Sequence, residues 1–231
     1  ISYTAEIGEI YPDGDIYIFC VSDDSLSSLL KTVRIKSEAL LLHTSGSLPM
    51  DVLKPFSKHY GVIYPVQTFS KKRDLDFDEI PLCIEGCSSS VSGRIKILAE
   101  KLSSKIHAIN SQQRKELHLA AVFACNFPNY LYGVAGKLLE ENGLSFAMLR
   151  PLIFETAHKV MLLTPEEAQT GPAKRGDESI MNMHKSMLKQ DKELLKIYTL
   201  LSEGIKEAQV KESTDEPKTS SSEINDMPTL W

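Results

Sequence analysis

The alternation of short apolar runs with helical segments in the first half of the chain constrains the fold more than any other feature. Five runs rich in β-branched and aromatic residues predict buried strands. They span residues 15–22, 39–43, 60–65, 82–85 and 106–109. Helical spacing of apolar residues lies between them, at 26–33 and 91–102. Strands that are apolar throughout are typical of parallel sheets covered by helices on both faces. We therefore predict an α/β domain with a mainly parallel sheet.

Small or polar residues follow the first three predicted strands. They are Ser22 and Asp23, then His43, Thr44, Ser45 and Gly46, and then Gln67. Ligands of open parallel sheets bind beyond the carboxyl ends of the strands, so these residues are candidates for a ligand site. The alternative is that they form ordinary polar loops.

The sequence changes character at Ser111, after which every strong pattern is helical. A long apolar helix is predicted for residues 111–142, where an Asn-Gly pair forms a common helix stop. Pro128 lies inside this helix and has no N–H for the carbonyl of Ala124, so we expect a kink. Asn126 stands beside the kink, where its amide either meets a ligand or satisfies the freed carbonyl.

Part of this helix, residues 117–136, is apolar over about 20 residues, which is near the length that spans a bilayer. Its His118, Asn126 and Asn129 would be costly in lipid. A helix buried in protein on most of its faces is therefore the better prediction.

Two more helices are predicted, at residues 146–163 and 177–205. The chain then becomes rich in Lys, Glu, Ser, Thr and Pro, a composition typical of disorder. The predicted organisation is an α/β domain at 1–110, an all-α domain at 111–207 and a disordered tail at 208–231.

The segment from Thr170 to Asp177 is too specialised for a plain connector. Gly171, Gly176 and a proline restrict its backbone, and Arg175 and Asp177 add charges of both signs. A rigid turn with free N–H groups and a guanidinium can bind an anion. Alternatively, the turn only separates two helices, and Asp177 caps the second.

Composition and missing patterns exclude several classes of function. The net charge of −5 and the lack of a basic excess argue against nucleic-acid binding. The four cysteines lack the usual zinc or redox spacings, so we expect free thiols in a cytoplasmic protein without a metal site. No basic-then-apolar N-terminal segment directs secretion, and no membrane span is predicted.

The chain contains no G-x-G-x-x-G loop, although a dinucleotide-binding sheet begins with one. The predicted strands correspond to the later strands of such a sheet. We therefore expect the first βαβ unit, with its glycine loop, to lie upstream of Ile1.

Five segments together resemble a family of bacterial two-domain proteins. They are DIYIFCVSD (15–23), LHTSGS (42–47), PVQTF (65–69), LHLAAVFACN (117–126) and QTGPAKRGD (169–177). Such proteins pair a Rossmann-like NADP-binding domain with a helical C-terminal domain of unassigned function. Their architecture is similar to that of pyrroline-5-carboxylate reductase, ketopantoate reductase and the β-hydroxyacid dehydrogenases. The resemblance implies a partial Rossmann-like sheet followed by a helical, dehydrogenase-like domain.

The resemblance further implies an NADP-dependent oxidoreductase acting on a small, carboxylated substrate in the cleft between two domains. It also implies a homodimer formed through the helical domain. The strand-end residues Ser22, Asp23 and 43–46 would bind the cofactor. The residues expected to bind the substrate are Gln67, Thr170, Gly171, Arg175, Asp177 and His184.

The catalytic residues cannot be taken over unchanged from the resemblance. The β-hydroxyacid dehydrogenases place a catalytic Lys one turn before an Asn, and Val122 stands in that position before Asn126. His118 is then the best candidate proton donor, with Asn126 beside it, because histidine is the side chain that titrates near neutrality. Two alternatives are that His118 is a core or interface residue, and that the protein is a non-catalytic binding or regulatory protein with a dehydrogenase fold.

Overall fold

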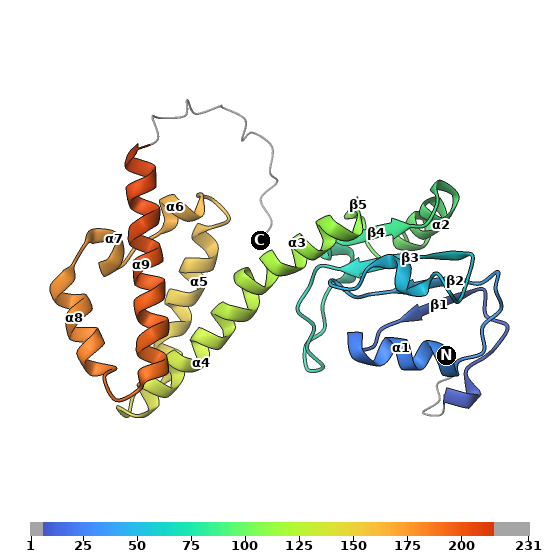
Figure 1. The fold of residues 1–231 in the computed structure, drawn as a ribbon. Helices are drawn as coiled ribbons and strands as arrows, with labels where there is room; N and C mark the ends of the chain where they lie inside the picture. The colour runs from blue at the N-terminus through green and yellow to red at the C-terminus, as the bar shows by residue number, and fades with distance from the viewer. Residues whose placement is uncertain (1–6, 215–231) are drawn as a thin grey trace. The chain divides into compact units, whose positions relative to one another are not determined.

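The computed structural model describes residues 7–214 of the chain, which divide into two compact units between Leu138 and Leu139. The first unit contains one five-stranded sheet (Figure 1). Its strands are β1 (Ile16–Phe19), β2 (Leu40–His43), β3 (His59–Pro65), β4 (Leu82–Gly86) and β5 (Ile106–Ala108). Each strand overlaps one of the five predicted runs.

The strands lie in the sheet in the same order as in the chain. Neighbouring strands are parallel except β3 and β4, which pair antiparallel. The prediction of a mainly parallel α/β sheet is therefore confirmed, and the antiparallel pair was not predicted. Three short 3-10 helices accompany the sheet, one before β1 and two in the connections that follow β2 and β3. They are η1 (Ile7–Glu9), η2 (Met50–Leu53) and η3 (Phe77–Glu79).

Helices α1 (Asp23–Thr32) and α2 (Ser89–Ala99) cover opposite faces of the sheet. Leu41 packs in a cluster with residues of α1, whereas Leu40 and Leu42 pack with residues of α2. Because successive side chains of a strand point to opposite faces, a sheet covered on both sides requires apolar residues at every position. This arrangement explains why the β2 segment is apolar without alternation.

The long helical segment contains α3 (Ser111–Ala121), a π-helical turn η4 (Val122–Asn126) and α4 (Phe127–Glu140). The N–H of Phe127 reaches the carbonyl of Val122, five residues back. Pro128 has no N–H, so the ladder breaks next to it and the extra residue is taken up in a π turn. The helix is therefore irregular next to Pro128, where a kink was predicted, and the irregularity is a π turn.

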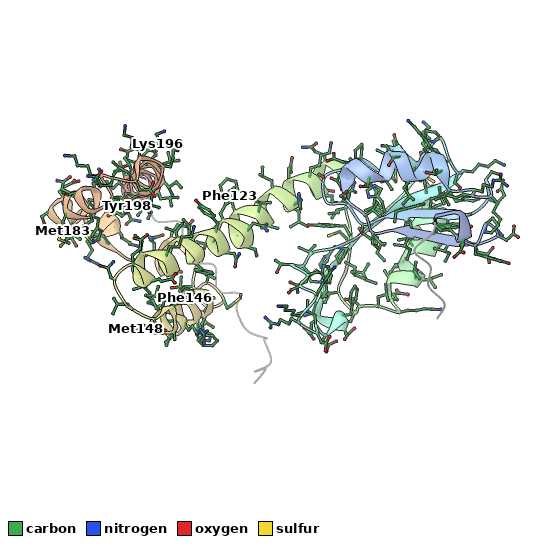
Figure 2. All side chains as sticks on the ribbon, turned by 90° about the horizontal axis from the view of Figure 1, so that it is seen from below. Phe123, Phe146, Met148, Met183, Lys196 and Tyr198 are labelled. Carbon is green, nitrogen blue, oxygen red and sulfur yellow. The ribbon has the colours of Figure 1, made fainter. Side chains whose placement is uncertain are left out.

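The prediction that this helix is buried on most faces is wrong for the described chain. No residue of α4 is buried. Leu119, Phe123, Phe127 and Tyr130 are 58%, 63%, 48% and 59% exposed, and Figure 2 shows the Phe123 side chain projecting from the helix. We call these four residues the apolar stripe. None of the helices within residues 7–214 combines the length and apolar character that crossing a bilayer requires.

The second unit is all-helical, as predicted. Its elements are η5 (Phe146–Leu149), α5 (Arg150–Lys159), α6 (Pro165–Ala168), α7 (Pro172–Arg175), α8 (Glu178–Met187) and α9 (Lys192–Thr214). Helices α7 and α8 pack against the long helix α9 (Figure 1). The fold class, a mainly parallel α/β sheet followed by helices, is confirmed.

Several predicted boundaries in the helical half were wrong. The single helix expected at 177–205 is two helices, because Asp191 accepts the N–H of Leu194 and starts a new helix. The helix expected at 146–163 ends at Lys159. Residues 208–214, assigned to the tail, are part of α9. The remainder of the predicted tail lies outside the described residues.

The first compact unit extends to Leu138, whereas the sequence suggests a domain change at 110–111. The difference arises because α3 packs on the sheet. Leu117 of α3 lies against a buried cluster formed by Val62, Tyr64 and Cys83. This packing brings the polar residues of α3 to the strand ends.

Candidate functional site

Helix α3 meets the sheet through three polar residues on one face, Ser111, Arg114 and His118. Their spacing of three and four residues places them one above another along the helix. The helix is started by a capping box, in which Asn110 and Gln113 bond each other's backbone N–H groups.

A row of paired strand residues lies opposite this face. His43 of β2 pairs with Val62 of β3, and Val62 pairs with Glu85 of β4. Glu85 accepts the backbone N–H of Ser111 at 2.9 Å and its hydroxyl at 2.7 Å. Its carboxylate also forms an ion pair with Arg114. The start of α3 is thus bonded to the middle of the sheet.

Arg114 also binds the loop that follows β2. Its Nη2 donates to the carbonyl of Leu48 at 2.6 Å, and Ser111 Oγ accepts the N–H of Met50 at 3.2 Å. The Arg114 side chain is 1% exposed and that of Glu85 is 15% exposed. Because a buried ion pair is costly to break on one side only, this pair holds α3, β4 and the loop together.

His43 is buried at the end of β2, with 1% of its surface exposed. Its Nδ1 accepts the N–H of Ser45 at 3.2 Å. Burial and the nearby positive charge of Arg114 lower its pKa from 6.5 to about 4, although the Pro49 carbonyl and the charge of Asp23 act in the opposite direction. His43 is therefore neutral near pH 7 with its proton on Nε2, because Nδ1 is the atom that accepts the N–H of Ser45.

The loops after β1 and β2 are joined through their side chains. Asp23 accepts the hydroxyl of Ser47, and the backbone N–H of Thr44 bonds to the carbonyl of Phe19 at 3.2 Å. Ser45 Oγ accepts the N–H of Ser47 at 3.1 Å, and Ser22 Oγ lies 2.7 Å from the Oγ of Ser25. Of the strand-end residues predicted from the sequence, Asp23, Thr44 and Ser45 are therefore linked along one edge, which is rich in hydroxyl groups.

His118 lies against this edge. Its Nδ1 is 3.2 Å from the hydroxyl of Tyr64 on β3, and the two rings meet edge to face. A Cβ added to Gly46 would lie only 2.7 Å from Cγ and Nδ1 of His118. Gly46 is therefore needed for the close approach of the β2 loop to the helix. The structure brings two separately predicted residues, Gly46 and His118, into contact.

Asn126 and Gln67 are not held in this network by any interaction the structure records. Asn126 is exposed at the end of the π turn. A π turn uses more residues per turn than an α-helix, so Asn126 lies closer around the helix to His118 than α-helical spacing predicts. Gln67 uses its side-chain carbonyl to accept the N–H of Thr68 at 2.7 Å.

In the second unit, the segment from Thr170 to Asp177 is a rigid turn around the short helix α7. Gly171 and Gly176 have φ values of 104° and 71°, which other residues rarely adopt. The guanidinium of Arg175 binds Asp177 Oδ2 through Nε at 2.9 Å and Nη2 at 2.8 Å. Asp177 makes no side-chain cap with α8. The predicted cap is therefore absent, and the carboxylate of Asp177 instead holds the guanidinium of Arg175.

His184 occupies a packing position between two helices. Its Nδ1 lies 2.9 Å from the hydroxyl of Tyr198, so the pair joins α8 to α9. Thr170 accepts a bond from Gln169 through its backbone carbonyl. A substrate role for Thr170, Gly171 or His184 stays a prediction.

Glu85, Arg114 and Tyr64 were not among the site residues predicted from the sequence. A signal for the first two was present, since Glu85 ends an otherwise apolar strand and Arg114 lies one turn before His118. Charged residues are rarely buried unless they are paired, so two such positions suggest a buried ion pair. Tyr64 carried no such signal, because an aromatic residue inside a strand is ordinary.

The strand-end edge fits one end of a dinucleotide better than the other. Uncharged hydroxyl groups from Ser22, Thr44 and Ser45 suit a ribose, and Gly46 permits close approach. The pyrophosphate of a dinucleotide needs a glycine-rich turn at a helix N-terminus, and these 231 residues contain no G-x-G-x-x-G loop. In the described part of the chain, no group of three or more His, Cys, Asp or Glu residues is placed to hold a metal ion.

Comparison with known proteins places the chain among dehydrogenase-like folds. Residues 80–205 match the domain of unknown function DUF2520. The crystal structure of a putative NADP oxidoreductase from Bacteroides fragilis is 45% identical, with a TM-score of 0.85 over 89% of this chain and 80% of that one. A search of the curated proteins found no significant match.

Two more distant structures agree on the fold. A protein from Thermotoga maritima is 24% identical, with a TM-score of 0.72 over 88% of this chain and 82% of that one. An imine reductase from Myxococcus stipitatus in complex with NADP+ is 12% identical, with a TM-score of 0.50 over 86% of this chain and 74% of that one.

Replacing Arg114 with Met should lower the free energy of unfolding by about 3–5 kcal/mol, because it leaves the carboxylate of Glu85 largely buried and unpaired. Urea denaturation followed by circular dichroism measures the loss. The matched control is Lys105→Met, which removes the exposed ion pair with Glu79 and should cost about 0–1 kcal/mol. Equal losses in the two variants would contradict the importance of the buried pair.

The stability of the protein should fall as the pH drops from 6.5 to 4, the range between the ordinary and the folded pKa of His43. The unfolded chain binds the proton first, so His43 alone should remove up to about 3 kcal/mol across this range. The His43→Asn variant keeps an acceptor for the N–H of Ser45 but cannot titrate. Its free energy of unfolding should depend less on pH over this range, and an unchanged slope would contradict the assignment.

Proposed function

This chain belongs to the DUF2520 family, and on that premise we propose that it is an NADP-dependent oxidoreductase acting on a small, carboxylated substrate. The observation that carries the proposal is the placement of His118 against Gly46 and Tyr64 at the ends of the parallel strands. The name of the Bacteroides fragilis relative supports the cofactor and the class of reaction.

The proposed reaction reduces a carbon–oxygen or carbon–nitrogen double bond. A reduced nicotinamide, when bound, would supply a hydride for the carbon of this bond. His118 in its charged form releases a proton to the oxygen or nitrogen of the same bond, which yields an alcohol or an amine. His118 is left neutral and regains its proton from solvent. The hydroxyl groups of Ser22, Thr44 and Ser45 would bind a ribose of the cofactor and so orient the cofactor beside His118.

Arg175 is the proposed ligand of the substrate carboxylate. Its guanidinium is 61% exposed and held in one orientation by Asp177. A guanidinium oriented in this way has N–H donors on a fixed plane, which is the geometry that carboxylates bind.

We further propose that the protein is a cytoplasmic homodimer formed through its helices. The apolar stripe is exposed along α3 and α4, and the rings of Phe123 and Phe127 lie 4.9 Å apart within it. Monomeric proteins rarely leave such patches in water, and two-fold dimers are the commonest way to cover them. The four cysteines are free, which suits a reducing compartment.

Replacing His118 with Gln should lower kcat by about 100-fold or more, since general acid catalysis contributes about 10²–10⁴-fold. The natural full-length protein is assayed for NADPH oxidation with a panel of small 2-oxo acids and carboxylated cyclic imines. The KM for NADPH should change little. Lys115→Gln, an exposed change on the same helix, is the control.

Two results would overturn this function. An absence of NADPH binding by both thermal shift and fluorescence would contradict an oxidoreductase. Binding of NADPH without turnover of any substrate in the panel would favour the alternative, a non-catalytic binding or regulatory protein. The observation that favours this alternative is Val122, which stands where the β-hydroxyacid dehydrogenases have their catalytic Lys.

Replacing Phe123 and Phe127 together with Glu should convert the dimer into a folded monomer, because two charges would be buried at its interface. Light scattering after size exclusion gives the mass, and circular dichroism confirms the fold. The control variant, Lys101→Glu, changes an exposed residue outside α3 and α4 and should stay dimeric. A monomeric wild type at micromolar concentration would contradict the proposed interface.

A further inference from the structure

We propose that Tyr64 is a positioning residue for His118, which it holds through Nδ1 so that Nε2 is the atom that exchanges a proton with the substrate. The inference rests on the proposed function of His118, and it names which ring nitrogen acts and what fixes it. Nothing in the sequence alone connects the two residues, which lie 54 positions apart.

The known contacts of the His118 ring lie on one of its edges. The hydroxyl of Tyr64 is 3.2 Å from Nδ1. The Cα of Gly46 faces the same edge, because a Cβ built there would lie 2.7 Å from Cγ and Nδ1 and 3.0 Å from Cβ of His118. In an imidazole ring, Nε2 lies on the opposite side from Cγ. The contacts therefore cover Nδ1 and leave Nε2 available.

Tyr64 is a rigid support for this ring. It lies in the middle of the sheet, on β3, and is 9% exposed. Its strand partner is Cys83, and it packs in one cluster with Val62 and Leu117. His118 follows Arg114 by one turn of α3, and Arg114 is bonded to Glu85 and Leu48. Both ends of the Tyr64–His118 contact are thus attached to buried structure.

Tyr64 can serve both charge states of the histidine. Burial, and then the neighbouring Cys83, raise the pKa of its hydroxyl above the ordinary value, so the hydroxyl keeps its proton. A protonated hydroxyl can donate to Nδ1 of a neutral ring, which leaves the proton on Nε2. When the ring is charged, both of its nitrogens carry protons, and the rotated hydroxyl accepts the N–H of Nδ1 while Nε2 delivers its proton. Exchange of protons with solvent then restores the resting ring, which is protonated on Nε2.

This arrangement makes a specific prediction for the resting protein. The neutral ring of His118 should have its proton on Nε2, with Nδ1 as the acceptor of the Tyr64 hydroxyl. Removing the hydroxyl frees the ring to change tautomer and to rotate about its own bonds. The loss should reduce proton transfer without changing the binding of the cofactor.

The test compares Tyr64→Phe with Tyr60→Phe in the natural full-length protein. Tyr60 is a matched control, because it lies on the same strand and face and its hydroxyl bonds to Asp51 at 3.2 Å, away from His118. The first readout is nitrogen NMR of ring-labelled histidine without substrate. The second is the split between kcat and the KM for NADPH.

Wild type and Tyr60→Phe should show one His118 tautomer, protonated on Nε2, at a pH where the ring is neutral. Tyr64→Phe should move both ring nitrogen signals toward a mixture of tautomers. Its kcat should fall about tenfold, the effect of one lost hydrogen bond, with the KM for NADPH unchanged. Circular dichroism confirms that each variant is folded.

Three outcomes would overturn the proposal: a neutral wild-type ring protonated on Nδ1, ring signals unaffected by Tyr64→Phe, or an equal effect of Tyr60→Phe. The NMR readout needs neither cofactor nor turnover. A protein without oxidoreductase activity would therefore refute the proposed function, while the NMR result would still decide the role of Tyr64.

Discussion

The buried ion pair between Arg114 and Glu85 is the interaction on which the candidate site depends. It joins the first turn of α3 to β4, and Arg114 extends the connection to the loop after β2 through Leu48. An ion pair so far from water is stable only while both partners and their hydrogen bonds are in place. It therefore sets the position of α3 on the sheet far more narrowly than apolar packing of Leu117 could.

The chemistry of the edge follows from that position. The charge of Arg114 helps to keep His43 neutral, and the placement of α3 puts His118 within reach of Tyr64 and Gly46. The two histidines thus have different environments on one face of the sheet. His43 is enclosed and supports the β2 loop, whereas His118 keeps one ring nitrogen available. This difference supports the proposal that His118, and not His43, transfers the proton.

The strands and most helices could be predicted because burial leaves a local signature. A strand covered on both faces must be apolar at every position, as residues 40–42 are. The antiparallel pairing of β3 and β4 was not predicted, because a buried strand has the same apolar pattern whether its neighbour is parallel or antiparallel. The break at Asp191 was missed because the apolar period continues through it, and a single capping side chain decided the outcome.

The sequence by itself determined that an α/β half is followed by a helical half. It also determined the polar strand ends, the turn around Arg175 and the choice of His118 as a candidate proton donor. Each of these is a property of residue type and spacing along one segment. Only the tertiary structure decided that Glu85 and Arg114 pair, that Gly46 lies beside His118, and that Tyr64 is its partner. These contacts join residues 29 to 72 positions apart. These contacts depend on the order of the strands in the sheet and on where α3 packs against them. The spacing of residues along the chain specifies neither.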